Sequence, residues 1–232
     1  MHLRDAWERN AAQWVLWART PGHDSYWRFH RDAFFELLPQ PGRLTLDIGC
    51  GEGRLTRDLQ AGGHRTIGVD VSPTLVEAAR AADPAGEYAL ADAASLPFPD
   101  GHADLAVAFM SFQDVDDMAG AVREAARVLE PGGRLVIAVV HPLDSGLVLQ
   151  REHPEEALVM THDYFDRRQY ADTFERDGLT MTFESRHWTL GDYFDALAAG
   201  GLLVDALREI PDPEHSRSSR YPLFLHLRAV KT

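Results

Sequence analysis

The stretch LTLDIGCGEGRLTRDL, Leu44–Leu59, decides how the rest of the chain is interpreted. An apolar run that contains Asp47 is followed by three glycines within five residues: Gly49, Gly51 and Gly53. Glycine lets the backbone approach a ligand closely, and the first N–H groups of a helix have no partner inside that helix. The stretch therefore predicts a nucleotide-type binding loop between a buried strand and a helix.

The spacing of these glycines differs from the dinucleotide-binding fingerprint, which is G-x-G-x-x-G. Arg54 stands where the third glycine of that fingerprint would be. An arginine there hinders the close helix–strand packing that glycine permits. The carboxylate of Asp47 is unfavourable beside a pyrophosphate, but it suits either a ligand's ammonium group or the water and amide groups that hold the loop closed. The stretch therefore disfavours a dinucleotide.

The composition bounds the class of protein. The 232 residues carry a formal charge of −13, which disfavours nonspecific binding to nucleic acid or to an anionic membrane. Cys50 is the only cysteine, so no intrachain disulfide can form and a reducing compartment is expected. The start, MHLRDAWERN, has no signal-peptide pattern, and no apolar stretch reaches the length of a membrane span. We expect a cytoplasmic protein without nucleic-acid or membrane partners.

Apolar and helical segments alternate between residues 44 and 140. Strands are expected at 44–48, 66–69, 87–90, 103–109 and 135–140, and helices at 54–60, 73–82 and 118–129. Ser72 and Pro73 supply a cap and a first residue for the second of these helices. Continuous apolar strands that alternate with helices are typical of a parallel sheet covered on both faces. The sequence therefore predicts an α/β fold.

The segments on either side interrupt this alternation. The first forty residues predict two helices rich in tryptophan, separated by Pro21 and Gly22. Residues 141–186 have mixed polarity and many aromatic side chains, and a segment this long is usually functional or has structure of its own. A helix capped by Thr189 and two strands complete the chain.

Four segments, in order along the chain, resemble the motifs of one enzyme family. They are LDIGCGEGRL (46–55), GVDVS (68–72), ADAASLPFPDGHADLAVAFMSF (91–112) and REAARVLEPGGRLVIAVVHP (123–142). The first is similar to motif I of class I S-adenosylmethionine-dependent methyltransferases, and the branch resembled most is the small-molecule group related to ubiquinone and menaquinone biosynthesis methyltransferases. The resemblance implies a Rossmann-like, doubly wound sheet of seven strands, mostly parallel with an antiparallel last strand.

The resemblance also divides the chain by role within one methyltransferase domain, 1–232. We expect an N-terminal helical cap (1–40), a cofactor-binding core (44–140), a lid or substrate insert after the fifth strand (141–186) and a C-terminal helix with two strands (187–232). The implied cofactor is S-adenosylmethionine and the product S-adenosylhomocysteine. No metal site is expected, and the protein is expected to be a monomer or a homodimer.

Individual residues of the motifs take implied roles. Asp70 ends the second strand, where a carboxylate can accept both ribose hydroxyls, although it could instead cap the next helix. Asp92 resembles the acid that accepts from the adenine amino group, with Ala93 supplying a backbone N–H, although a turn aspartate is the alternative. Cys50 is expected to pack rather than to react. The expected cofactor-binding set is Asp47, Gly49, Cys50, Gly51, Gly53, Asp70, Val71, Asp92, Ala93, Phe109 and Met110.

The acceptor side is expected to lie under the segments that interrupt the alternation. A sulfonium methyl is already activated, so alignment matters most and a base is needed only for a protonated acceptor. His141 follows the fifth strand at the carboxyl edge and is the first choice as base. The expected substrate pocket contains Trp14, Trp17, Tyr26, Trp27, His141, Tyr164 and His187, although tryptophans at helical spacing also suit an ordinary core.

The expected function is therefore methyl transfer from S-adenosylmethionine to an O, N or C atom of a small metabolite. Two alternatives remain at this point. One is a nicotinamide-dependent oxidoreductase, which the position of Arg54 disfavours. The other is a non-catalytic S-adenosylmethionine-binding partner in a larger assembly.

Overall fold

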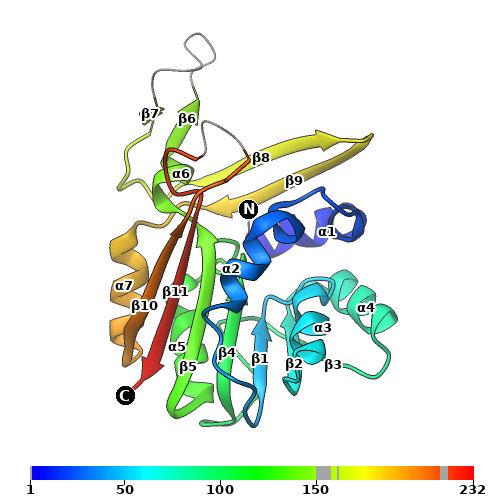
Figure 1. The fold of residues 1–232 in the computed structure, drawn as a ribbon, viewed down its shortest axis with the longest axis vertical. Coiled ribbons are helices and arrows are strands. Elements are labelled where there is room, and N and C mark those ends of the chain that lie inside the picture. Colours follow the sequence, from blue (N-terminus) through cyan, green and yellow to red (C-terminus); the bar gives the residue numbers. More distant parts are fainter. Residues whose placement is uncertain (1, 150–157, 161, 215–218) are drawn as a thin grey trace.

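The computed structural model describes residues 2–149, 158–160, 162–214 and 219–232. Its centre is a seven-stranded sheet with the order β10-β11-β5-β4-β1-β2-β3 (Figure 1). The strands are β1 (Thr45–Ile48), β2 (Thr66–Asp70), β3 (Glu87–Leu90), β4 (Ala103–Phe109), β5 (Leu129–Val140), β10 (Leu202–Ile210) and β11 (Phe224–Lys231). β11 runs antiparallel to both of its neighbours, β10 and β5, and all other neighbouring pairs in this sheet are parallel. The predicted Rossmann-like sheet with an antiparallel last strand is confirmed.

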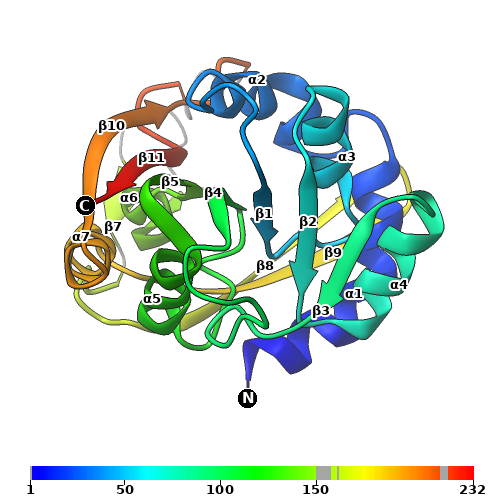
Figure 2. The same cartoon turned by 90° about the horizontal axis from the view of Figure 1, so that it is seen from below.

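Helices cover both faces of the sheet (Figure 2). They are α3 (Arg54–Ala61), α4 (Pro73–Ala82), α5 (Met118–Val128) and α7 (Leu190–Ala199). Alternate residues of β4 serve opposite faces: Ala106 packs in the core with α5 and α7, and Leu105 packs in the core with α3. Successive side chains of a strand point to opposite faces, so both faces of the sheet are covered by packed side chains. Because β1, β2, β3, β4 and β5 are parallel, their carboxyl ends lie at one edge of the sheet.

The fifth strand begins earlier than its apolar pattern predicts. Leu129 already pairs with Ala103, and Arg134 pairs with Leu105, so the ladder shifts register between them. Pro131–Gly133, which lie before the strand expected at 135–140, therefore form a bulge inside β5, with Gly132 at a φ of 80°. An extra run of residues in one strand locally interrupts the ladder without ending the strand.

The N-terminal segment forms helices as predicted, with one local difference. The first is α1 (Leu3–Arg19). The second begins as a π-helical turn, η1 (Tyr26–His30), and continues as a short α2 (Arg31–Phe35). Within the described parts of the chain, no helix combines the length and the apolarity that crossing a membrane requires.

The insert has structure of its own. It contains α6 (Pro142–Gly146), the paired strands β6 (Leu147–Leu149) and β7 (Leu158–Met160), and a hairpin of β8 (Gln169–Arg176) and β9 (Leu179–Arg186). The hairpin turns at Asp177 and Gly178, which both have positive φ, as a two-residue turn requires. The hairpin lies over α1 in Figure 1.

Helix α1 is bonded both to the core and to the hairpin. Glu8 accepts hydrogen bonds from the Ser72 and Thr74 hydroxyls at the start of α4. On the other side, Trp7 Nε1 donates to Glu184 O at 3.0 Å and Asn10 Nδ2 donates to Thr182 O at 3.0 Å, both on β9. The helix therefore joins the start of α4 in the core to the hairpin of the insert.

Thr189→Ala is expected to lower the free energy of unfolding by about 1 kcal/mol. The Thr189 hydroxyl accepts from Asp192 N at 3.1 Å, and Asp192 Oδ2 accepts from Thr189 N at 2.9 Å, which together form a capping box at the start of α7. Urea unfolding measures the change. Thr189→Ser keeps the hydroxyl and serves as the control, so an equal loss in both variants would contradict the cap.

Candidate active site

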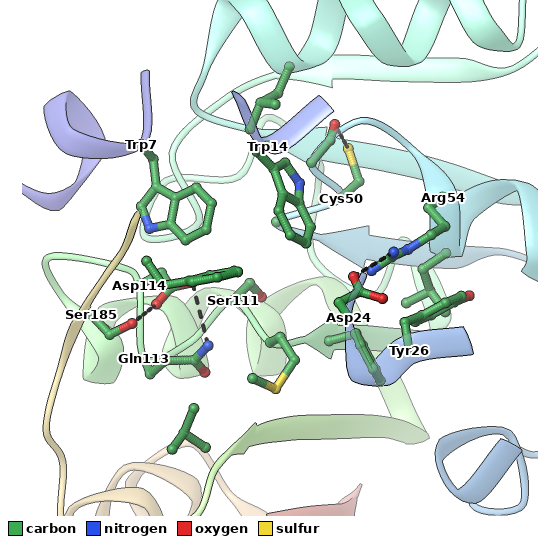
Figure 3. A pocket seen from close by; sticks show the side chains of 18 of the residues that line it. Trp7, Trp14, Asp24, Tyr26, Cys50, Arg54, Ser111, Gln113, Asp114 and Ser185 are labelled. Carbon is green, nitrogen blue, oxygen red and sulfur yellow. Dashed lines mark hydrogen bonds and ion pairs between the residues drawn. The ribbon is translucent and has the colours of Figure 1, made fainter. Parts of the chain in front are cut away.

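A cavity of 490 Å³ lies at the carboxyl edge of the parallel strands. Ile48, Asp70 and Phe109, at the ends of β1, β2 and β4, form its floor, and side chains of α1 and of the β8–β9 hairpin line it from the other side. Its volume falls within the range of about 300–1,000 Å³ that small-molecule sites occupy. In Figure 3, Asp114, Ser185 and Gln113 gather on one side of the cavity, and Arg54, Asp24 and Tyr26 on the other.

The glycine loop brings the backbone to the cavity wall. Gly49, Gly51 and Gly53 all have positive φ, at 77°, 57° and 82°. A Cβ at Gly49 would lie 2.3 Å from Ser111 Cβ, so a side chain there is excluded. Gly53 does not line the cavity; it precedes α3, and a Cβ there would meet the Tyr88 hydroxyl at 2.9 Å. The predicted cofactor set therefore meets at the cavity except for Gly53.

Asp70 ties the second strand to the glycine loop. Its Oδ2 accepts from Gly51 N at 2.8 Å, and its Oδ1 accepts from Ser72 N at 2.9 Å. Burial raises the pKa of this carboxyl, and the amide hydrogen bonds oppose the rise. Asp70 lines the cavity together with Val71. Its position therefore allows both the ribose contact and the local backbone contact that the sequence left open.

Asp47 is buried beneath the loop. It is 1% exposed, and its Oδ2 accepts from the Thr56 hydroxyl at 2.6 Å. Burial raises its pKa to about 7, because desolvation penalises the charged form more than the Thr56 hydrogen bond favours it. The carboxyl therefore links β1 to α3 across the glycine turn.

Asp47→Asn is expected to flatten the dependence of stability on pH. Between the ordinary pKa of 3.8 and about 7, folded protein holds a proton on Asp47 that unfolded protein has lost. The free energy of unfolding of the wild type therefore falls as the pH rises through this window, by about 1.4 kcal/mol per pH unit relative to the variant. Denaturant unfolding of both proteins across the window measures the difference. Parallel curves would show that Asp47 does not titrate in this way.

Asp92 and Ala93 line the cavity beyond β3. Asp92 Oδ1 accepts from Ala94 N at 2.9 Å, which is the turn contact left open by the sequence. Its Oδ2 lies 3.2 Å from Arg4 Nη2, so α1 reaches this end of the cavity. The carboxylate thus has a structural partner on each oxygen.

Arg54, in the place of a third glycine, holds the N-terminal segment against the core. Its Nη1 donates to Asp24 Oδ2 at 2.7 Å and to Ala18 O at 3.0 Å. Its guanidinium carbon lies 4.0 Å from the centre of the Tyr26 ring, a cation–π contact. Arg54, which would hinder the helix–strand packing of a dinucleotide-binding loop, therefore forms part of the wall of this cavity.

The expected substrate residues separate into two groups. Trp14, Trp17 and Tyr26 line the cavity, whereas Trp27, His141, Tyr164 and His187 do not. His187 uses both ring nitrogens elsewhere, with Ser145 Oγ at 2.7 Å and Tyr164 O at 2.8 Å. The Tyr164 hydroxyl accepts from Leu190 N at 3.0 Å. These two residues therefore join the insert to the start of α7.

Trp27 is 48% exposed and packs edge-on against Tyr26.

His141 is not at the cavity either. Its neighbour Val140 lines the cavity, and successive residues of a strand point to opposite faces. The His141 ring is 1% exposed; its Nδ1 accepts from Leu143 N at 3.1 Å, and its Nε2 lies 3.3 Å from Glu209 Oε1 on β10. Burial lowers its pKa. His141 therefore lies outside the cavity, and this geometry does not support its expected role as a base that meets substrate.

Asp114 is one of several titratable groups at the cavity that the sequence did not single out. It follows β4, and its Oδ1 accepts from the Ser185 hydroxyl at 2.6 Å (Figure 3). Gln113 Nε2 makes a longer bond of 3.4 Å to Oδ2. Burial raises the pKa of Asp114 well above its ordinary value, and the charge of Asp70 adds to the rise. The available signal was its place just beyond the fourth strand, at the edge where the loop and Asp70 also lie.

Cys50, Phe109 and Met110 line the cavity as apolar groups. Burial raises the pKa of the Cys50 thiol well above its ordinary value, so the thiolate is disfavoured. Phe109 packs edge-on against Tyr26, with ring centres 5.4 Å apart. Met110 has a φ of 55°, and its backbone turns away from β4 at this point.

Comparison with known proteins supports the methyltransferase-like interpretation of the sequence motifs. Residues 46–137 match the model of a family described as a methyltransferase domain. An O-methyltransferase, cnsE, of Penicillium expansum is 38% identical over 53% of this chain and 49% of its own length. A demethylmenaquinone methyltransferase of Corynebacterium kroppenstedtii is 33% identical over 51% of this chain and 50% of its own length. The chain spans about a third to a half of the length of such curated relatives.

One solved structure matches the fold over more of the chain than these curated relatives do. The S-adenosylmethionine-dependent methyltransferase of Mesorhizobium loti has a TM-score of 0.72 and 25% identity, covering 90% of this chain and 98% of that one. The resemblance to class I S-adenosylmethionine-dependent methyltransferases is therefore confirmed, in the sequence of the core and in the fold.

Proposed function

We propose that this protein transfers the methyl group of S-adenosylmethionine to an O, N or C atom of a small molecule. The observation that carries the proposal is the meeting of the glycine loop, Asp70 and Asp92 in one cavity at the carboxyl edge of the sheet. The methyltransferase-domain match over residues 46–137 and the related folds support it.

The residues present fit the proposed cofactor. A side chain at Gly49 is excluded by Ser111, and a Cβ at Gly51 would approach Trp14 Nε1 at 3.1 Å, so the loop keeps its backbone open to a ligand. Asp70 would hold the ribose, Asp92 and Ala93 the adenine, and Asp47 with the loop the methionine end. The cofactor would supply an activated methyl group.

The chain's own contribution is alignment and exclusion of water. Orienting an acceptor beside a reactive group is worth roughly 7–11 kcal/mol of barrier. The aromatic side chains of α1 and of the hairpin enclose the acceptor side, with Trp7, Trp14 and Phe183 in mutual edge-on contact. Asp114 replaces His141 as the group that would accept a proton, because it lines the cavity.

The proposal extends to the organisation of the chain. We propose a single domain, 1–232, in which residues 1–40 and 141–186 cover the core of 44–140 and residues 187–232 complete the sheet. The lone cysteine suits a reducing, cytoplasmic location. A monomer or a homodimer without nucleic-acid or membrane partners remains our proposal for its state.

The test combines binding and turnover. Calorimetry with S-adenosylhomocysteine and with NAD is expected to show heat of binding for the first only. Incubation with S-adenosylmethionine that carries a deuterated methyl group, followed by mass spectrometry of candidate metabolites, is expected to show transfer of that group. Binding of NAD alone would support the oxidoreductase instead. Binding of S-adenosylhomocysteine with no transfer to any O, N or C acceptor would favour the non-catalytic partner.

A further inference from the structure

One face of the β8–β9 hairpin forms the acceptor side of the cavity. Tyr170, Asp172 and Phe174 alternate along β8, so they point to the same face, and Phe183 and Ser185 alternate along β9 in the same way. All five line the cavity. Tyr170 pairs with Ser185 and Asp172 with Phe183 in the hairpin register. The hairpin therefore presents aromatic rings and a carboxylate together.

Two further carboxylates face the same region from the core. Asp114 follows β4, and Asp144 lies in α6, one helical turn beyond β5. The charges of Asp114, Asp144 and Asp172 all act on the Tyr170 hydroxyl and raise its pKa, after the larger effect of burial. In the described part of the chain, neither Asp114 nor Asp144 has a basic side chain within ion-pair distance. The acceptor side therefore carries uncompensated acidic groups.

Gln113 gives independent evidence of a missing hydrogen-bond donor. It is 4% exposed and lines the cavity. Its Nε2 faces Asp114 at 3.4 Å, which leaves Oε1 as an acceptor, and this atom has no partner among the described residues. A buried acceptor without a partner is unfavourable, so a bound N–H donor that reached this atom would offset the cost.

We infer that the acceptor is an amine carried on an apolar, aromatic-sized body, held by Asp114, Asp144, Asp172 and Gln113 within the aromatic walls. This inference rests on the proposed function and names its substrate class. Carboxylates with aromatic faces recognise ammonium groups through charge and cation–π attraction. The cavity also contains arginines, but Arg4, Arg28 and Arg54 are each paired with a carboxylate and Arg176 donates to backbone carbonyls. A carboxylate or phosphate acceptor would instead be repelled by the ionised forms of Asp114, Asp144 and Asp172.

The chemistry balances with the groups present. The bound ammonium gives one proton to Asp114, and the neutral amine keeps the lone pair that forms the new N–C bond, while the electron pair of the broken S–C bond leaves with sulfur. The product is a protonated methylamine, and Asp114 returns its proton to solvent when the product leaves. Only the amine and the methyl donor are required.

The test uses matched ligands of one shape. Calorimetry on the full chain, saturated with S-adenosylhomocysteine, compares 2-phenylethylamine, 2-phenylethanol and phenylacetate, and then tryptamine with its alcohol and carboxylate counterparts. We expect each amine to bind about 10- to 100-fold more tightly than its alcohol, because hydrogen bonds to charged groups are worth about 1.5–3 kcal/mol. The carboxylates are expected to bind weakest.

Three variants complete the design. Asp114→Asn and Asp172→Asn are each expected to reduce the amine preference about tenfold, whereas the exposed Asp32→Asn leaves it unchanged. Equal affinity for amine and alcohol, a tighter carboxylate, no amine binding at millimolar concentration, or a preference unchanged in both cavity variants would overturn the inference alone. Failure of the wild type to bind S-adenosylhomocysteine would overturn the proposed function, and this inference with it.

Discussion

Asp114→Asn is expected to lower turnover about 100- to 10,000-fold, the range that general acid–base groups contribute. Asparagine keeps the shape of the side chain and can still accept from the Ser185 hydroxyl, which lies 2.6 Å from the carboxylate. It cannot accept a proton from an acceptor in the cavity. Because the cofactor residues are untouched, affinity for S-adenosylhomocysteine is expected to stay within about threefold of wild type. Single-turnover kinetics and calorimetry measure the two quantities separately.

A histidine variant provides the control. His141→Gln alters the group first expected to act as base, which faces Glu209 rather than the cavity. Its turnover is expected to equal that of wild type once thermal unfolding has shown that the variant is folded. If His141→Gln loses turnover and Asp114→Asn does not, the assignment of the base to Asp114 is refuted.

Asp70→Ala is expected to weaken S-adenosylhomocysteine by about 10- to 100-fold for each hydrogen bond that the carboxylate makes to the ligand. The substitution also removes the bonds from Gly51 N and Ser72 N, so the glycine loop loses its anchor to β2. Asp70→Asn keeps the shape and one acceptor, and a smaller loss is expected. Calorimetry on both variants measures the affinities.

The exposed Asp100→Ala is the matched control for this experiment, since that side chain is 83% exposed and pairs with Arg127 away from the cavity. Unchanged affinity in Asp70→Ala, with unfolding temperatures that match wild type, would rule out a ribose contact. A loss only in unfolding temperature would assign Asp70 to the loop alone.

The centre of the sheet could be predicted because β1, β2 and β4 are mostly buried and mostly apolar. These strands alternate with helices along the chain, and this pattern depends on local sequence alone. The hairpin β8–β9 could not be read in the same way, because one face meets a cavity and the other meets solvent, so aromatic and charged residues mix. The pair Asp177-Gly178 was the available signal, since Asp-Gly between two strands favours a hairpin turn.

The cofactor side of the candidate site could be predicted, because local sequence motifs form it. The acceptor side could be predicted less well, because residues far apart in the sequence meet there. Asp70 ends β2 and Asp92 follows the end of β3 by two residues, so the strand pattern places both at one edge of the sheet. His141 continues the series of Leu135, Ile137 and Val139, which packs in the core on the face covered by α5 and α7. The partner of Asp114, Ser185, lies 71 residues away, and no local pattern connects them.

The bonds of α1 have a consequence for how molecules enter and leave. Glu8 fastens this helix to α4, and Trp7 and Asn10 fasten it to β9, so it cannot follow one side without straining the other. Under the proposed function, a movement of the hairpin that admits an acceptor would therefore also strain the start of α4, where Ser72 lies two residues after Asp70. Binding of the acceptor and binding of the cofactor would then be coupled through α1.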